Sequence, residues 1–298
     1  MMQPHFLSLA PSTTRASAAL SELNQALVSG GVLEPRGPVG AGNAQILLNS
    51  LAIMLMIVVP TLLATIAFAW WFRASNSRAT YRPDWTYSGR VELIVWGIPL
   101  LVVLFLSGVI WIGSHDLDPA RPLAGEQKPL EIQVVSLDWK WLFIYPEEGV
   151  ASVNEIAVPA DRPVHFTLTS ATVMNMFFVP QLGSMIATMN GMVTELHLKA
   201  DRPGSYYGLS AQYSGAGFAD MHFLLRALPP ESFAQWTAEA RKSGTALDEN
   251  AYLALARERA ASPPRLYGSI DRALFEKVAA RRLQSDASLP AGHAEPME

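Results

Sequence analysis

The most informative residue types and spacing occur in the segment SAQYSGAGFADM, which runs from Ser210 to Met221. Ser210, Gln212, Ser214 and Met221 bring hydroxyl, amide and thioether groups together within this short segment. Copper electron-transfer sites depend on thiolate and imidazole ligands, and these positions supply hydroxyls, an amide and a thioether. An upstream segment, VMNMFFVP, likewise offers only the amide of Asn175. These residue types therefore offer no strong copper ligand in either segment.

The composition supports the same interpretation. The chain of 298 residues contains no cysteine, which excludes thiolate copper sites, disulfides and cysteine-bound iron–sulfur clusters. None of the six histidines forms the short-spaced pair of a local zinc motif: His5, His115, His165, His197, His222 and His293. No basic patch indicates nucleic-acid binding, since the net charge is −4.

Methionines gather around these two segments. A thioether Cu(I) site is chemically conceivable, but methionine more often fills a core or an interface. The sequence favours the second interpretation and leaves the first open for Met174, Met176, Met185, Met189, Met192 and Met221.

The loop resembles the copper loop C-x-E-x-C-G-x-x-H-x-x-M in subunit II of cytochrome c oxidases. Gly215 and Met221 keep their places in that frame. The ligand positions are changed: Ser210 and Ser214 replace the cysteines, Gln212 the glutamate, Phe218 one histidine and Asn175 the other. The chain thus resembles subunit II of a haem–copper quinol oxidase of the cytochrome bo type. The resemblance implies a subunit II that lacks the copper relay.

That resemblance implies a non-redox, structural subunit of a proton-pumping quinol:O2 oxidoreductase of the aerobic respiratory chain. It implies no cofactor in this chain, with haems, copper and quinol bound by the partner subunit I, and further small membrane subunits in the complex. Asp138-Trp139-Lys140-Trp141 matches the aromatic pair of the family, and large tryptophans there favour packing onto the partner subunit. Tyr213 and Phe218 are expected to fill the space left by metal and imidazole.

Two apolar stretches predict membrane spans. Residues from about 46 to 72 and from 91 to 112 are long enough to cross a bilayer, which needs roughly 20 residues. Arginines dominate the segment between them, at positions 73, 78, 82 and 90, against the single acid Asp84. The positive-inside rule places this loop in the cytoplasm and both termini in the periplasm, which predicts a two-span protein of a bacterial inner membrane, in contact with its lipid.

Glu92 is the one acid at the edge of a span. An acid at a helix N-terminus is stabilised by the helix dipole, so a purely structural role is one interpretation. The context SGRVELIVWGIP also resembles the family's second span, where a glutamate lies at the mouth of a proton channel, and that resemblance implies a role in proton entry.

The expected fold class is membrane-anchored α+β, with a transmembrane hairpin, a cupredoxin-like Greek-key β-sandwich and a C-terminal helical arm. In the sandwich, alternation around His165 and His197 places both on polar faces and predicts surface positions. The helical arm is expected to dock on another subunit. The expected parts are a flexible periplasmic segment at 1–45, a hairpin at 46–113 with its cytoplasmic loop at 73–90, a cupredoxin-like periplasmic domain at 128–228, the arm at 229–284 and a disordered tail at 285–298.

Two alternatives remain. A cytochrome c oxidase subunit II with working copper would need cysteines and histidines at Ser210, Ser214, Asn175 and Phe218. A membrane-anchored cupredoxin-like binding or assembly protein without an oxidase fits the same residues more loosely. Phe6 to Ala10 is too short for the apolar part of a secretory signal, which leaves the first span as its own insertion signal or an earlier start.

Overall fold

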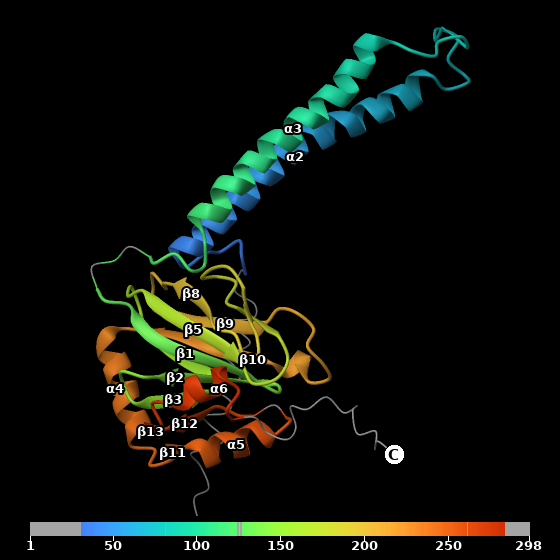
Figure 1. Ribbon diagram of the computed structural model, residues 1–298. Coiled ribbons are helices and arrows are strands. Elements are labelled where there is room, and N and C mark those ends of the chain that lie inside the picture. The colour runs from blue at the N-terminus through green and yellow to red at the C-terminus, as the bar shows by residue number, and fades with distance from the viewer. Residues whose placement is uncertain (1–30, 81, 124, 126, 261, 284–298) are drawn as a thin grey trace, which may run out of the picture. The chain divides into compact units, whose positions relative to one another are not determined.

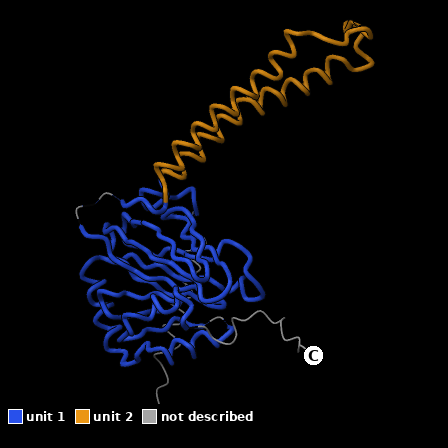
Figure 2. Tube along the Cα trace, viewed as in Figure 1, with its two compact units in different colours: residues 1–41, 119–298 blue, residues 42–118 orange. Residues whose placement is uncertain are grey.

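The computed structural model describes residues 31–80, 82–123, 125, 127–260 and 262–283. These residues form two compact units (Figure 2). One unit spans Gly42–Asp118, and the other contains the described residues up to Ala41 and from Pro119 onward. Most of the expected flexible segment at 1–45 and the whole tail at 285–298 lie outside the described residues.

The unit Gly42–Asp118 is a helical hairpin (Figure 1). Helix α2 runs over Pro38–Trp71 and helix α3 over Gly89–Asp116, and by length and composition each could cross a membrane. Both contain a proline, Pro60 in α2 and Pro99 in α3. The two helices come close where Gly113 of α3 leaves room for the end of the Ile46 side chain of α2.

The first residues of α2, up to Ala41, belong to the β-rich unit. The backbone N–H of Gly40 donates to the carbonyl of Leu182 at 3.0 Å. A side chain at Gly37 would meet the carbonyl oxygen of Lys199 at 2.1 Å. Glycine is therefore needed here for the close approach of two backbones.

The other unit, drawn in blue in Figure 2, contains a β-sandwich. One six-stranded sheet has the order β12-β3-β2-β1-β5-β8, and one five-stranded sheet has the order β4-β10-β9-β6-β7. Strands β1 and β5 pair in parallel, as do β4 and β10, and the remaining pairs are antiparallel. The strands are β1 Leu130–Leu137, β2 Lys140–Tyr145, β3 Val150–Val153, β4 Glu155–Pro159, β5 Val164–Ser170, β6 Asn175–Phe178, β7 Ile186–Thr188, β8 Thr194–Leu198, β9 Gly204–Ser210, β10 His222–Leu228 and β12 Arg265–Tyr267.

Both sheets contribute to one core. Phe166 of the six-stranded sheet lies against Phe177 of the five-stranded sheet, with 5.5 Å between ring centroids. Phe177 also stacks on Phe223 of β10 at 5.0 Å. Such aromatic contacts contribute beyond the area they bury, and they hold the two sheets face to face.

The C-terminal arm contains helices α4 Pro230–Arg241, α5 Glu249–Arg257 and α6 Leu274–Ala279, and a small parallel pair of β11 Ala246–Leu247 and β13 Ser269–Ile270. Helices α5 and α6 of the arm pack on the outer face of the six-stranded sheet, whereas Phe233, Trp236 and Ala240 of α4 join the core of the sandwich. Asp248 caps α5, because its carboxylate accepts from the backbone N–H of Ala251 at 2.8 Å. A second core joins this arm to strands β1, β2 and β3: Val135, Leu137, Leu142, Ile144, Ala151 and Val153 with Tyr252, Leu255, Leu274, Phe275 and Val278.

The predicted fold class is confirmed: a two-helix hairpin, a cupredoxin-like sandwich and a helical arm. The apolar helix faces of the arm are covered by this chain's own sheet. The outward-facing residues of β1 and β2 are buried for the same reason. Docking of the arm on another subunit stays a prediction.

Candidate functional site

The structure brings together two predicted site residues that lie 35 positions apart in the sequence. Asn175 is the first residue of β6 and Ser210 is the last residue of β9, and these strands pair antiparallel. Both residues are almost fully buried, with 1% and 2% of their surface exposed. The Ser210 hydroxyl donates to Asn175 Oδ1 at 3.3 Å. A neutral hydrogen bond therefore joins the two positions.

The hydrogen bonds continue away from this pair. Asn175 Nδ2 donates to the carbonyl of Val173 at 3.2 Å, and the Thr188 hydroxyl donates to the carbonyl of Asn175 at 3.1 Å. The Thr188 hydroxyl also bonds to that of Ser136 at 2.8 Å. Buried polar groups are stable when partnered in this way. All these side chains are uncharged, so the site offers hydroxyl and amide groups where a copper centre would need thiolate and imidazole.

Trp139 packs on the loop that follows β9. Its backbone lies in the left-handed region, with φ of 64°. A Cβ atom added at Gly215 would lie 2.4 Å from the Trp139 ring, and one at Gly217 would lie 2.2 Å from it. Gly215 also has a positive φ of 135°. The two glycines therefore let the indole ring lie directly against the loop backbone, and this packing fixes the loop.

The remaining loop residues have different positions. Met221 is buried, whereas Gln212 is exposed. The Ser214 hydroxyl is buried and has no hydrogen-bond partner among the described residues. Phe218, in the short 3-10 helix Phe218–Asp220, meets the edge of the Tyr213 ring with 5.8 Å between centroids. The expectation that Tyr213 fills internal space is wrong, because 80% of its surface is exposed.

The tryptophan pair divides its roles. Trp141 is fully buried in the core of the sandwich, edge-on to Phe177 and Phe223. It therefore cannot pack onto a partner subunit as the sequence suggested. Trp139 is only partly buried and covers the loop. The two tryptophans do not lie in the same strand. Trp139 lies in the turn between β1 and β2, and Trp141 lies in β2.

No three histidine, aspartate or glutamate side chains in the described part of the chain are placed to hold one metal ion. Met174, Met185 and Met192 are exposed, whereas Met221 is buried. The methionines therefore differ in environment, and the absence of a metal in this chain stays a prediction.

The histidines on neighbouring strands form a cluster with two carboxylates in which only His197 is buried. His165 and His197 pair across β5 and β8, and their rings stack with 4.4 Å between centroids. His165 Nδ1 lies 2.7 Å from Glu131, and Glu195 lies 3.6 Å from its Nε2. His197 is 7% exposed, so the prediction of a surface position is wrong for it. The segment at Pro119 covers it, and its carbonyl lies 3.3 Å from His197 Nδ1.

Glu92 lies in the first turn of α3, at the end of the connecting loop. The indole N–H of Trp96, one turn further on, donates to its carboxylate at 3.1 Å. The side chain is exposed within this chain. It is therefore available to another subunit or to water.

Sequence reasoning gave no role to Lys140. Its side chain is fully buried, and its ammonium donates to the carbonyl of Leu255 at 2.9 Å and to that of Glu258. Burial lowers its pKa, against the opposing effect of the Glu258 carboxylate. Cations favour the C-terminal ends of helices, and Lys140 fills that role for α5. The helix end lies 115 residues away in sequence, so no local pattern could reveal it.

Known proteins show clear similarity to this chain. The family model described as cytochrome c oxidase subunit II, periplasmic domain, matches residues 131–228, and that described as COX aromatic rich motif matches residues 241–281. Ubiquinol oxidase subunit 2 of Acetobacter aceti is 44% identical over 270 residues, covering 89% of this chain and 88% of that one. Cytochrome bo(3) ubiquinol oxidase subunit 2 of Pseudomonas aeruginosa is 43% identical over 277 residues, covering 92% and 84%. The chain therefore belongs to the ubiquinol oxidase subunit 2 family.

Proposed function

We propose that this chain is a non-redox subunit of a proton-pumping quinol:O2 oxidoreductase. The observation that carries this proposal is the hydrogen bond between Ser210 and Asn175, at positions where the related copper proteins need a cysteine and a histidine. The named relatives are ubiquinol oxidase subunits. A subunit without a copper relay suits an oxidase whose electrons come from quinol within the membrane.

The partner in this proposal is the oxidase subunit that carries the haems, the copper and the quinol. The two long apolar helices would brace it within the bacterial inner membrane, and the sandwich would cover it from the periplasm. The excess of arginine over acid between α2 and α3 supports a cytoplasmic position for that loop. Glu92 would then lie at the cytoplasmic edge of the complex, where a proton path could begin.

Purification of the tagged chain in mild detergent tests the proposal. We expect haem to co-purify, quinol to be oxidised with O2 as the acceptor, and reduced cytochrome c to give no turnover. Copper is expected to match the haem-bearing partner alone. A colourless and inactive preparation, or one that oxidises cytochrome c, would contradict the proposal.

A further inference from the structure

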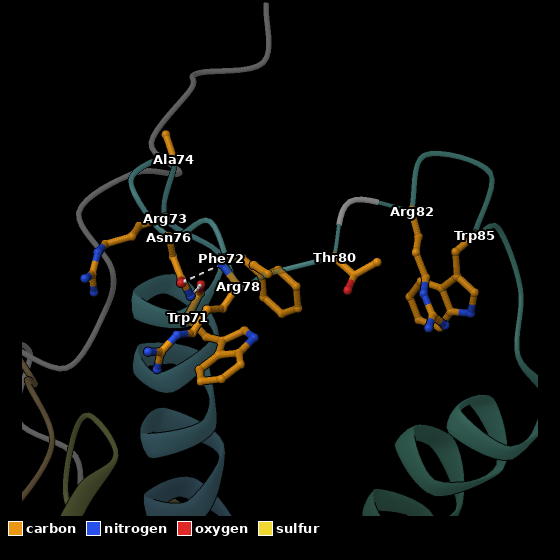
Figure 3. Close-up of a pocket in the computed structure, with 10 residues that line it drawn as sticks. Trp71, Phe72, Arg73, Ala74, Asn76, Arg78, Thr80, Arg82 and Trp85 are labelled. Atoms are coloured by element: carbon orange, nitrogen blue, oxygen red, sulfur yellow. Dashed lines mark hydrogen bonds between the residues drawn. The ribbon is translucent and has the colours of Figure 1, made fainter.

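The segment that joins α2 to α3 forms a pocket at the ends of the two apolar helices (Figure 3). Its volume is about 820 Å³, within the roughly 300–1,000 Å³ of small-molecule sites. Trp71, at the last residue of α2, and Trp85 of the loop contribute aromatic surface. Tryptophans at such positions lie at the level of lipid headgroups when a helix crosses a membrane.

Three arginines line this pocket. Arg73 is held by neighbouring groups: its Nε donates to the Ser75 hydroxyl at 2.9 Å, and its guanidinium lies 4.9 Å from the Trp70 ring centroid. Arg78 and Arg82 form no ion pair with any carboxylate in the described part of the chain. The pocket thus concentrates positive charge without an internal counterion.

The chemistry of the lining fits a phosphate group. Guanidinium groups bind phosphate oxygens through paired hydrogen bonds, and the Thr80 side chain adds a hydroxyl at the same pocket. A positive-inside signal requires only charge near the span. Here the arginines also line a cavity beside tryptophans, which is the arrangement expected of a lipid-headgroup site.

We propose that this pocket binds the phosphate headgroup of an anionic phospholipid such as phosphatidylglycerol. The acyl chains would lie along the exposed apolar surfaces of α2 and α3, where Phe72 and Leu93 flank the loop. Three arginines without a carboxylate favour a headgroup with net negative charge over a zwitterionic one. The proposal rests on insertion of both helices in a membrane, which is part of the proposed function.

Native mass spectrometry of the purified full-length protein in its complex tests this site. The probes are dioleoyl phosphatidylglycerol and dioleoyl phosphatidylcholine. We expect preferential retention of phosphatidylglycerol by the unaltered protein. Arg82→Gln should weaken that retention about tenfold, since a hydrogen bond to a charged group is lost. Arg90→Gln is the matched control, because it removes one arginine near the same loop but outside the pocket.

Several results would overturn the site. They are equal retention of both lipids, equal effects of Arg82→Gln and Arg90→Gln, or displacement of phosphatidylglycerol by inorganic phosphate, which would indicate a soluble anion. Arg82→Lys keeps the positive charge and is expected to keep the lipid preference. This variant distinguishes the effect of losing the charge from an effect of misfolding.

Haem content and quinol oxidation are measured on the same samples. Normal haem and turnover without lipid selectivity contradict the lipid site alone. Lipid selectivity in a preparation without haem contradicts the proposed oxidase function alone.

Discussion

At the scale of single residues, the bond from Ser210 to Asn175 links β9 to β6. Both groups are buried, and each has a partner. A buried hydrogen bond of this kind contributes about 0.5–1.5 kcal/mol net. The bond therefore stabilises the pairing of the two strands without any ion.

Replacement of the two serines should have opposite consequences. Ser210→Ala removes the donor to Asn175 and should lower the free energy of unfolding by about 1 kcal/mol. Ser214→Ala is the matched control, because its buried hydroxyl has no partner among the described residues, and it should be neutral or slightly stabilising. Thermal unfolding of the full-length chain in detergent measures both. Equal losses would show that the bond has no special contribution.

Contact between Trp139 and the loop can be tested by coupling. Gly217→Ala places a methyl group 2.2 Å from the indole ring and should cost about 1–3 kcal/mol. In a Trp139→Ala background the same change should cost much less, because the ring is gone. Gly204→Ala, whose nearest contact is 3.6 Å away, is the control. Additive effects of Gly217→Ala and Trp139→Ala would refute the packing role.

At the scale of elements, Lys140 connects the sandwich to the helical arm. It projects from β2 and donates to carbonyls at the end of α5. Orphan carbonyls at a helix end need such donors. The bond therefore holds the arm against the six-stranded sheet. Trp139 lies in the turn directly before β2 of that sheet.

Loss of this donor should loosen the arm. Lys140→Met keeps the length of the side chain but leaves buried carbonyls without a partner, at a cost of about 1–3 kcal/mol. Limited proteolysis should then cut near the end of α5 faster. Lys277→Met, which breaks only exposed ion pairs with Glu249 and Asp271, should have a smaller effect. Equal proteolysis of both variants would argue against a cap.

Two histidines of the sandwich, His197 and His222, make it sensitive to acid because their pKa values are lowered. Burial lowers the pKa of His197 below its usual value of 6.5, with a further lowering from the neighbouring His165. The carboxylates of Glu131 and Glu195 oppose this shift. Burial also lowers the pKa of His222. Below pH 6.5 the unfolded chain binds more protons than the folded chain, so stability falls as pH falls.

We therefore expect a lower unfolding temperature at pH 5.5 than at pH 7.5. His197→Gln should reduce that difference, and the double variant with His222→Gln should reduce it further. Unfolding temperatures across this range, measured in one detergent, provide the test. An unchanged pH dependence in both variants would mean that other groups control it.

At the scale of the whole molecule, Glu92 is the candidate for a role in turnover. Its carboxylate is exposed in this chain and bonds to Trp96. If protons enter here, Glu92→Gln should slow quinol oxidation by about a hundredfold or more, within the range of a positioned proton-transfer group. Glu92→Asp keeps the acid and should retain more activity. Normal turnover of Glu92→Gln, with normal haem content, would exclude proton entry at this position.

Much of the molecule follows from the sequence alone. Two long apolar stretches determine the candidate membrane helices, because the hydrophobic length needed to cross a bilayer is fixed. The absence of cysteine determines that no thiolate copper site can form.

Tertiary structure decided what covers each surface. The alternation of apolar and polar residues predicts that His197 lies on the polar face of its strand. The segment at Pro119 covers His197 on that face. Lys140 and Trp139 gained their roles from partners distant in sequence, α5 and the glycines of the loop. Local patterns report which way a side chain points, whereas the fold alone sets its neighbour. For this reason the absence of cysteine could be read from the sequence, but the hydrogen bond from Ser210 to Asn175 and the packing of Trp139 on the loop could not.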